Sequence, residues 1–283
     1  MIEIRGLQHR YGKALALDVP RLSIDTSTVL VGHNGAGKST LLLSLAGLLV
    51  PTEGVITIGG DPAGSPAARR RVSFVPDSPA LFDDLTLADQ MRYVARLHGG
   101  RKAEPAEAAN ELVELLDASE LLDRLPSAMS KGQRQKASLL VATARPCSVL
   151  LADEPTTGLD TESRDALLRG FAHLERSGVI IVSSTHDGEL IAATPGRLRL
   201  SGGRLADDAE AGPGAVGPVA PAPATWSDEA TGHAGPEHAG PEHAGPEHAG
   251  PGQAEEGGGQ RQPAGAATPP PSRWRSRSRF SEE

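Results

Sequence analysis

Apolar residues recur along the first 206 positions of the chain with two different periods. Short runs that are continuously apolar, or that alternate with polar residues, are typical of β-strands, whereas apolar residues three or four positions apart are typical of helices. Strands are predicted at residues 2–4, 15–24, 29–31, 55–58, 72–75, 149–152 and 179–183, with a hairpin at 198–205. Helices are predicted at 87–97, 106–116, 134–144 and 161–176, and one more is expected to end near Gly47.

Two details of the N-terminal strands can be predicted as well. Residues 2–4 alternate apolar and charged side chains, so we expect them to form an edge strand. Pro20 is expected to break the strand at 15–24, because proline lacks the N–H that a strand ladder needs. The mixture of strands and helices indicates an α/β fold, with a mostly helical subdomain at about residues 78–145.

The composition changes sharply after residue 206. Residues 207–283 contain no Leu or Ile, but 12 Pro and 13 Gly. Such a segment cannot bury enough apolar surface to offset the entropy lost on ordering. We therefore expect one folded domain, residues 1–206, and a disordered low-complexity tail, residues 207–283. The tail repeats H-A-G-P four times from His233 to Pro251, which favours a spacer over the alternative of a metal site.

Charge and cysteine usage narrow the class of protein further. The net charge is −8, and the tail, with 5 Arg against 12 Asp and Glu, accounts for −7 of it. A nearly neutral folded domain gives no electrostatic case for a nucleic-acid partner. Cys147 is the single cysteine, which fits a reducing compartment. The N-terminus has no apolar signal-peptide core, and no run approaches the roughly 18 apolar residues of a membrane span. Any membrane role is expected to need a separate partner.

The residues from Gly32 to Ser39 read G-x-x-x-x-G-K-S between a predicted strand and a predicted helix. This is the context of a Walker A phosphate loop, in which glycines let backbone N–H groups point inward and the helix start adds positive potential. Lys38 is expected to reach the β- and γ-phosphates, and the Ser39 hydroxyl to hold Mg²⁺. The predicted nucleotide-binding residues of the loop are Gly32, His33, Asn34, Gly35, Ala36, Gly37, Lys38, Ser39 and Thr40.

Four other residues carry candidate chemistry. Asp153 and Glu154 follow the apolar strand at 149–152, which is a Walker B pattern, with Asp153 in the Mg²⁺ shell and Glu154 polarising the attacking water. Ser130 is a natural N-cap for the helix that follows it. We interpret Tyr11 as a ring that stacks on a purine, with packing at a strand end as the alternative.

In this order and spacing, the motifs resemble those of the ATP-binding subunits of ABC transporters over residues 1–206. Tyr11 is similar to the aromatic A-loop, residues 32–40 to Walker A, Ser130-Lys131-Gly132-Gln133 to the signature motif, Asp153-Glu154 to Walker B, Gly158-Leu159-Asp160 to the D-loop and His186 to the switch histidine. The resemblance implies that residues 1–206 are an ABC ATP-binding domain. It also implies a P-loop NTPase fold, in which a RecA-like core carries an N-terminal antiparallel β subdomain and a helical subdomain.

The resemblance also implies a mechanism with ATP and Mg²⁺ as cofactors. Two cassettes would face each other head to tail, as a homodimer or a heterodimer. ATP on the Walker A of one would be completed by Ser130, Gly132 and Gln133 of the other, near the D-loop Asp160. Glu154 would be the catalytic base and His186 would contact the γ-phosphate. ATP hydrolysis would drive membrane-spanning permease subunits, so the chain would lie in the cytoplasm, peripheral on the inner face of the membrane.

The chain departs from the family pattern in two places. Asp77 stands where the family usually has a glutamine, and we expect it to bind Mg²⁺ or a water near the nucleotide. Lys131 replaces a glycine of the commoner signature. Both features resemble exporter-type members of an Ecs-like group. Residues 79–82 are expected to line the groove for a membrane subunit's coupling helix.

Two other functions stay open beside a transporter ATPase. A soluble ABC-type ATPase outside transport is disfavoured by the single cassette, the absence of a heptad run and the single cysteine. A module that binds ATP without hydrolysing it is disfavoured by the intact Lys38, Asp153, Glu154 and His186, although Asp77 keeps it open.

Overall fold

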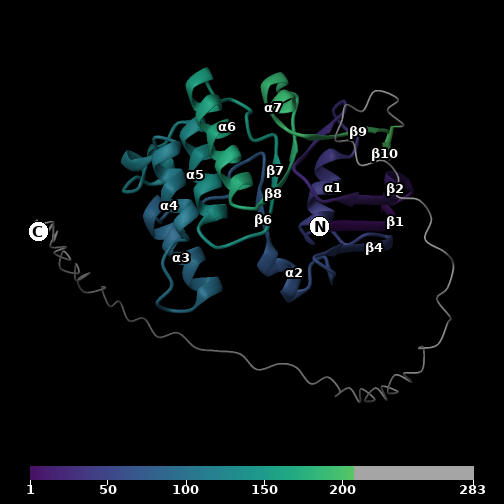
Figure 1. Ribbon diagram of the computed structural model, residues 1–283, viewed down its shortest axis with the longest axis horizontal. Helices are drawn as coiled ribbons and strands as arrows, with labels where there is room; N and C mark the ends of the chain where they lie inside the picture. Colours follow the sequence, from purple (N-terminus) through teal and green to yellow (C-terminus); the bar gives the residue numbers. More distant parts are fainter. Residues whose placement is uncertain (207–283) are drawn as a thin grey trace, which may run out of the picture. The chain divides into compact units, whose positions relative to one another are not determined.

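The computed structural model describes residues 1–206, so the predicted tail lies outside the described residues. The described strands form one mixed sheet in the order β5-β4-β1-β2-β10-β9-β3-β8-β7-β6. Figure 1 shows β1, β2 and β4 on the right and β6, β7 and β8 nearer the middle. The strands are β1 (Ile2–Tyr11), β2 (Ala14–Ile24), β3 (Thr28–Val31), β4 (Glu53–Ile58), β5 (Asp61–Pro62), β6 (Val72–Val75), β7 (Val149–Asp153), β8 (Ile180–Ser184), β9 (Gly196–Ser201) and β10 (Arg204–Leu205). The α-helices are α1 (Lys38–Leu45), α2 (Pro66–Arg71), α3 (Leu87–Gly99), α4 (Glu107–Leu115), α5 (Lys131–Thr143), α6 (Thr161–Arg176) and α7 (Gly188–Ala193).

The sheet has an antiparallel half and a parallel half. Strand β1 pairs with β2 and β4 in antiparallel fashion, and β4 pairs likewise with β5. Strands β3, β8, β7 and β6 are parallel to one another. Strand β9 joins the halves, because it is parallel to β3 and forms the expected hairpin with β10. The predicted α/β P-loop NTPase fold with an antiparallel N-terminal part is confirmed.

Two expectations for the N-terminal strands were wrong. Strand β1 is not at an edge, since β2 and β4 flank it on either side. Strand β2 runs unbroken through Pro20. The neighbour of β2 on its far side, β10, has two residues and pairs only at Asp18, so the N–H that Pro20 lacks is not needed there.

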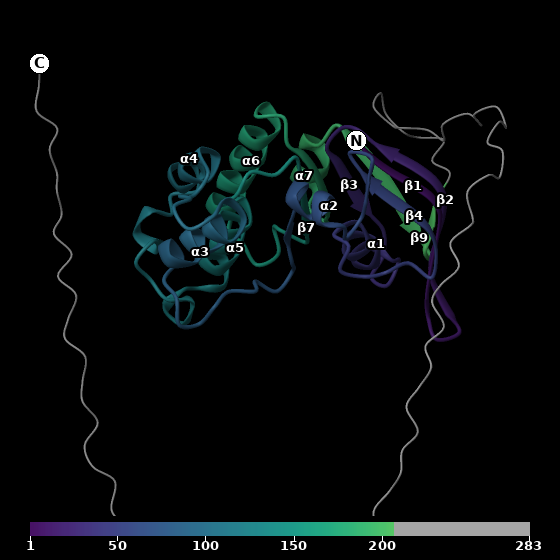
Figure 2. The same cartoon turned by 90° about the horizontal axis from the view of Figure 1, so that it is seen from below.

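The parallel strands are buried on both faces, as is typical of strands covered by helices on each side. Along β7, Leu150 and Ala152 belong to a core cluster with α3 to α6, whereas Val149 and Leu151 belong to a cluster with α1 and the antiparallel strands. Figure 2 shows this arrangement, with the helices α3 to α6 on one side of β7 and α1 on the other. The carboxyl ends of β3, β7 and β8 therefore meet at one edge between two packed layers.

Helices α2 and α7 were not predicted. Each spans six residues, which is too short to show a helical period of apolar side chains. Their starts are set by caps: the Ser65 hydroxyl accepts from the amide of Ala68, and the Asp187 carboxylate accepts from the amides of Glu189 and Leu190. Within residues 1–206, no helix is both long enough and apolar enough to cross a membrane.

Candidate nucleotide site

A cavity of about 610 Å³ opens where β3 ends and α1 begins. This volume lies within the range of small-molecule and cofactor sites. Its lining combines the phosphate loop, the end of β1, part of β2 and the β9–β10 turn: Tyr11, Leu15, Ala16, Asn34, Gly35, Ala36, Gly37, Lys38, Ser39, Thr40, Glu154, Gly202 and Gly203. The contribution of Leu15, Ala16 and the two glycines of the turn was not predicted from the sequence.

The backbone of the loop is shaped for an anion. Gly35 and Gly37 have φ angles of 81° and 105°, which side chains rarely tolerate. Gly37 also lies close to β2, since a Cβ there would be 3.0 Å from the carbonyl oxygen of Ala16. Helix α1 begins at Lys38, so the amides of residues 38–40 have no acceptor within the helix. These N–H groups and the positive helix start suit phosphate. The residues present therefore fit a nucleotide.

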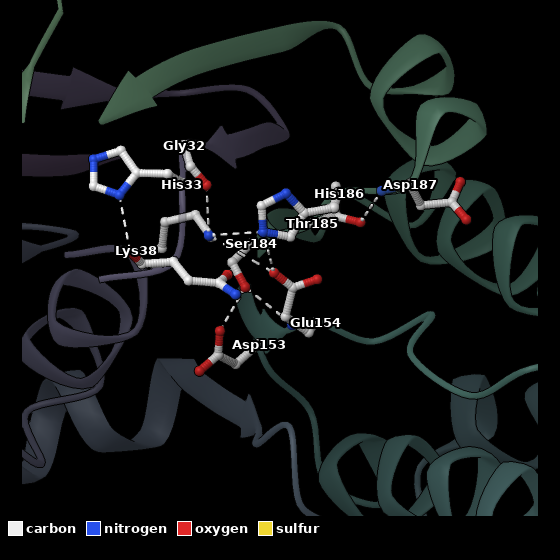
Figure 3. Close-up of polar contacts among 10 residues, drawn as sticks. Gly32, His33, Lys38, Asp153, Glu154, Ser184, Thr185, His186 and Asp187 are labelled. Carbon is white, nitrogen blue, oxygen red and sulfur yellow. Dashed lines mark hydrogen bonds and ion pairs between the residues drawn. The ribbon is translucent and has the colours of Figure 1, made fainter. Parts of the chain in front are cut away.

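Lys38 is buried, with 7% of its surface exposed, and its ammonium is the centre of the polar contacts in Figure 3. The ammonium donates to the carbonyl oxygen of Gly32 at 2.8 Å and lies 3.1 Å from Nε2 of His186. It is 3.8 Å from Oε1 of Glu154, and the same oxygen is 3.4 Å from Nε2 of His186. The structure thus brings together three predicted residues that come from far apart in the sequence.

Asp153 and Glu154 are fixed by a residue that the sequence analysis missed. The Ser184 hydroxyl, at the end of β8, donates to a carboxylate oxygen of the buried Asp153. The same hydroxyl accepts from the amide of Glu154 at 2.9 Å (Figure 3). In the parallel register, Asp153 and Ser184 are direct partners. One buried serine therefore holds both members of the acidic pair.

Glu154 has a left-handed backbone, with φ of 46°, although it is not a glycine. Its amide also lies 3.2 Å from the carbonyl oxygen of Ser184, and its own carbonyl accepts from Thr157 at 3.1 Å. Left-handed geometry in a residue of this kind is strained and persists only where surrounding contacts impose it. The strained turn directs the carboxylate towards Lys38 and His186 and away from the strand.

His186 lies between two anchored neighbours. The amide of Thr185 donates to the carbonyl of Leu30 in β3 at 3.3 Å, which holds the end of β8 against the strand before the phosphate loop. Asp187 caps α7 and is paired with Arg164 of α6 at 2.9 Å. His186 itself is exposed on one side and contacts Lys38 and Glu154 on the other. Its imidazole is thus positioned by the segments on either side of it.

The remaining predicted site residues do not line this cavity. Ser130 caps α5, and its hydroxyl and the Gln133 side chain form a reciprocal capping box with the backbone amides. The Lys131 side chain covers Gly158, where a Cβ would be 2.9 Å from the lysine Cδ. Asp160 caps α6, and the backbone N–H of Ser163 lowers the pKa of its carboxyl. Gly132 and the exposed Asp77 also lie outside the cavity lining.

A second, smaller hollow of about 220 Å³ lies between β6, α3 and α5. Ala80 and Leu81 belong to its lining, as does Val94 of α3. The adjacent loop is held by Gln90, a buried residue whose amide group makes hydrogen bonds to both backbone groups of Phe82 and to the carbonyl of Leu85. Phe82 remains half exposed and meets Tyr93 edge to face, with ring centroids 5.6 Å apart.

Comparison with known proteins agrees with this geometry. A family model described as ABC transporter matches residues 20–157. The spermidine/putrescine import ATP-binding protein PotA of Roseobacter denitrificans is 34% identical over 74% of this chain and 59% of its own length. The sulfate/thiosulfate import ATP-binding protein CysA of Caulobacter vibrioides is 37% identical over 66% of this chain and 58% of its own. The chain thus spans about three-fifths of the length of these curated relatives.

Solved structures are similar over the same region. A structure of an ATP-binding subunit of an ABC transporter superimposes with a TM-score of 0.65 and 30% identity, over 72% of this chain and 88% of the other. A dimeric bacterial ABC transporter cassette superimposes with a TM-score of 0.65 at 24% identity, which shows the fold. Both curated relatives are named as import proteins, so the exporter-type, Ecs-like subtype stays a prediction. The phosphate-loop lysine of the chain contacts Glu154 and His186, and Ser184 joins Glu154 to Asp153. Together with the matches to known proteins, this shows that the chain belongs to the family of ABC transporter ATP-binding subunits.

Proposed function

We propose that the chain binds ATP with Mg²⁺ and hydrolyses it to power transport through separate membrane subunits. The observation that carries the proposal is the position of the buried Lys38 ammonium, next to Glu154 and His186 and at the start of an amide-lined loop. A buried cation with one nearby carboxylate and several free amides favours a polyanionic ligand over a neutral one.

Different residues of the cavity would contact different parts of the nucleotide. Tyr11, half exposed at its rim, is suited to stack on the base. The amides of residues 38–40 and the Lys38 ammonium would hold the phosphates, with the rest of the loop around them. Ser39 and Asp153 would hold Mg²⁺, which neutralises charge on the phosphates when bound. Ser184 would keep the Asp153 carboxylate in the orientation that this role requires.

Hydrolysis needs a group that takes a proton from water at the γ-phosphate. Glu154 is suited to this role, because its carboxylate lies next to Lys38 while its backbone is held by Ser184. His186 is within 3.4 Å of that carboxylate and 3.1 Å of the ammonium, so it can orient the base and donate to a phosphate oxygen.

The residues of the signature motif lie outside the cavity, and their position suggests that the chain works as a dimer. Ser130, Gly132 and Gln133 stand at the start of α5, where the capping box leaves the amides of Lys131 and Gly132 available to a phosphate. Since they do not line the cavity of their own chain, we propose that they complete the site of a second cassette, with Asp160 beside them. The dimeric cassette of the same fold supports this arrangement. The second cassette is either a copy of this chain or a relative.

We place the membrane partner at the hollow between β6, α3 and α5, where residues 79–82 and the Phe82–Tyr93 pair offer apolar surface. Asp77 lies in the loop that enters this hollow, so it is suited to pass the state of the nucleotide site to the partner. The chain would then act in the cytoplasm on the inner face of the membrane.

Steady-state ATPase measurement on the purified chain, with and without Mg²⁺, tests the proposal. Lys38→Ala should abolish activity and weaken ATP binding strongly, because a buried charge facing the phosphates is lost. Lys102→Ala, at an exposed lysine outside the cavity, is the matched control and should retain both. Equal ATP affinity in the parent and in Lys38→Ala would refute the assignment of the phosphate loop.

A further inference from the structure

His9 is a buried polar residue without a polar partner. It lies in β1 with 6% of its surface exposed, and neither ring nitrogen has a hydrogen-bond partner within residues 1–206. An unpaired buried polar group is destabilising, and a leucine or valine would fill such a core position without this cost. A histidine at this position therefore indicates a role that an aliphatic side chain cannot fulfil.

The ring of His9 contacts one notable neighbour, the ring of Tyr11. The two ring centroids are 4.8 Å apart and the planes are inclined by 79°, an edge-to-face pair. Residues two apart in a strand share a face, so His9 lies directly inward of Tyr11 along β1. Tyr11 is 55% exposed at the rim of the nucleotide cavity.

On the side away from Tyr11, Leu17 of β2 lies between His9 and the phosphate loop. Its partner across the strand pair is Leu17, and directly paired residues have side chains on the same face. The side chain of Leu17 comes within 2.9 Å of where a Cβ of Gly37 would stand. Beyond this pair the register shifts, which leaves Ala16 as the extra residue of a bulge and places it in the cavity lining. His9 thus lies between the rim ring and the strand that supports the loop.

We propose that His9 is a positioning residue for the nucleotide base, which fixes the tilt of the Tyr11 ring before the nucleotide arrives. A half-exposed tyrosine would lose side-chain entropy on stacking, and a ring that is already held loses less. The edge-to-face contact supplies this restraint, while an aliphatic side chain would fill the volume without fixing the angle. The inference rests on the proposed binding of ATP in this cavity.

The test compares ATP with inorganic triphosphate, which has the phosphates but no base. His9→Leu should weaken ATP binding roughly three- to ten-fold, the worth of one aromatic pair, and leave triphosphate binding within about two-fold. His9→Phe keeps a ring and should retain ATP affinity within about two-fold of the parent. Leu7→Val, on the same face of β1, is the control for lost packing and should change neither ligand's affinity selectively.

A readout without ligand comes from the tyrosines themselves. The chain has two, Tyr11 and Tyr93, so 3-fluorotyrosine labelling gives two fluorine signals that Tyr11→Phe assigns. In the ligand-free protein, His9→Leu should shift and narrow the Tyr11 signal, as expected for a ring that has become mobile. The Tyr93 signal should stay unchanged, because its ring pairs with Phe82.

Several outcomes would overturn the inference. It fails if His9→Leu binds ATP as the parent does, if it weakens ATP and triphosphate equally, or if its loss persists in a Tyr11→Ala background. If Tyr11→Ala alone leaves the preference for ATP over triphosphate unchanged, Tyr11 does not hold the base and His9 has nothing to position. If the parent binds triphosphate and not ATP, the proposed function itself fails, which is a distinct result.

Discussion

The Ser184 hydroxyl donates a hydrogen bond to the Asp153 carboxylate, and both groups are buried. Partners of this kind orient a metal ligand, and their loss lowers metal affinity by about 10- to 100-fold. We therefore expect Ser184→Ala to raise the Mg²⁺ concentration for half-maximal ATPase activity by at least about 10-fold. Ser183→Ala is the control, because the neighbouring side chain points to the opposite face of β8. An unchanged Mg²⁺ dependence in Ser184→Ala would contradict this role.

Glu154→Gln should bind ATP at least as well as the parent and should turn it over about 10²- to 10⁴-fold more slowly, as expected when a general base is lost. The amide keeps the shape of the side chain and removes the negative charge that lies 3.8 Å from the Lys38 ammonium. Equilibrium binding measures whether the variant retains its ATP affinity, and single-turnover hydrolysis measures the loss of rate. Glu107→Gln on the exposed start of α4 is the control. Hydrolysis at the parent rate would exclude Glu154 as the base.

Head-to-tail pairing can be tested by mixing two inactive variants. Lys38→Ala removes the phosphate-loop half of a site and Ser130→Ala the signature half. In a mixed dimer, one site combines the intact loop of one chain with the intact signature of the other. The mixture should therefore regain roughly a quarter of the parent ATPase activity, since about half of the dimers are mixed and each has one intact site. No recovery, with mixed dimers detected by differential tagging, would argue against shared sites.

Ser130→Ala also removes the N-cap of α5, which alone is worth about 1 kcal/mol of unfolding free energy. A second capping variant separates the two effects. Thr86→Ala removes the hydroxyl that caps α3, a residue outside the proposed shared site. It should lose a comparable amount of stability and retain the ATP-driven dimerisation, measured by sedimentation.

Gln90→Leu should lower the free energy of unfolding by about 2–4 kcal/mol, because it leaves the Phe82 amide and the Leu85 carbonyl without partners. The Phe82 carbonyl would keep only its long contact with the Leu85 amide, at 3.4 Å. Urea unfolding measures this loss. Gln8→Leu is the control, since that partly buried side chain makes one long contact, at 3.4 Å. A loss no larger than that of Gln8→Leu would mean that water replaces the Gln90 contacts.

Much of the candidate site could be predicted because each of its parts is marked by a short, local sequence pattern. The phosphate loop needs glycines, a lysine and a hydroxyl in fixed order, and the acidic pair follows an apolar strand. The edge at which they meet was also predictable, since parallel strands bring their carboxyl ends together. Ser184 could have been found in the same way: it follows the predicted strand at 179–183, as Asp153 follows the strand at 149–152, and the two are paired residues.

Other features depend on packing that no local pattern records. The interior position of β1 was missed because its alternation reports one buried face and says nothing of how many neighbours it has. The tolerance of Pro20 depends on the shortness of β10, whose residues lie far away in sequence. The environment of His9 could not be predicted either, because its burial is set by the pairing with Leu17 and by the ring of Tyr11.

The left-handed backbone at Glu154 lowers the stability of the fold, while the side chain it carries is the one proposed for catalysis. A non-glycine residue in this geometry stores about 1–3 kcal/mol of strain, a sizeable share of the stability of an ordinary domain. A chain optimised for thermal resistance alone would carry glycine there, and an engineer screening for heat-stable variants would tend to recover that substitution. Such variants would unfold later and, if Glu154 is the base as proposed, hydrolyse ATP about 10²- to 10⁴-fold more slowly. Stability screens of this fold therefore need an activity readout at the same step.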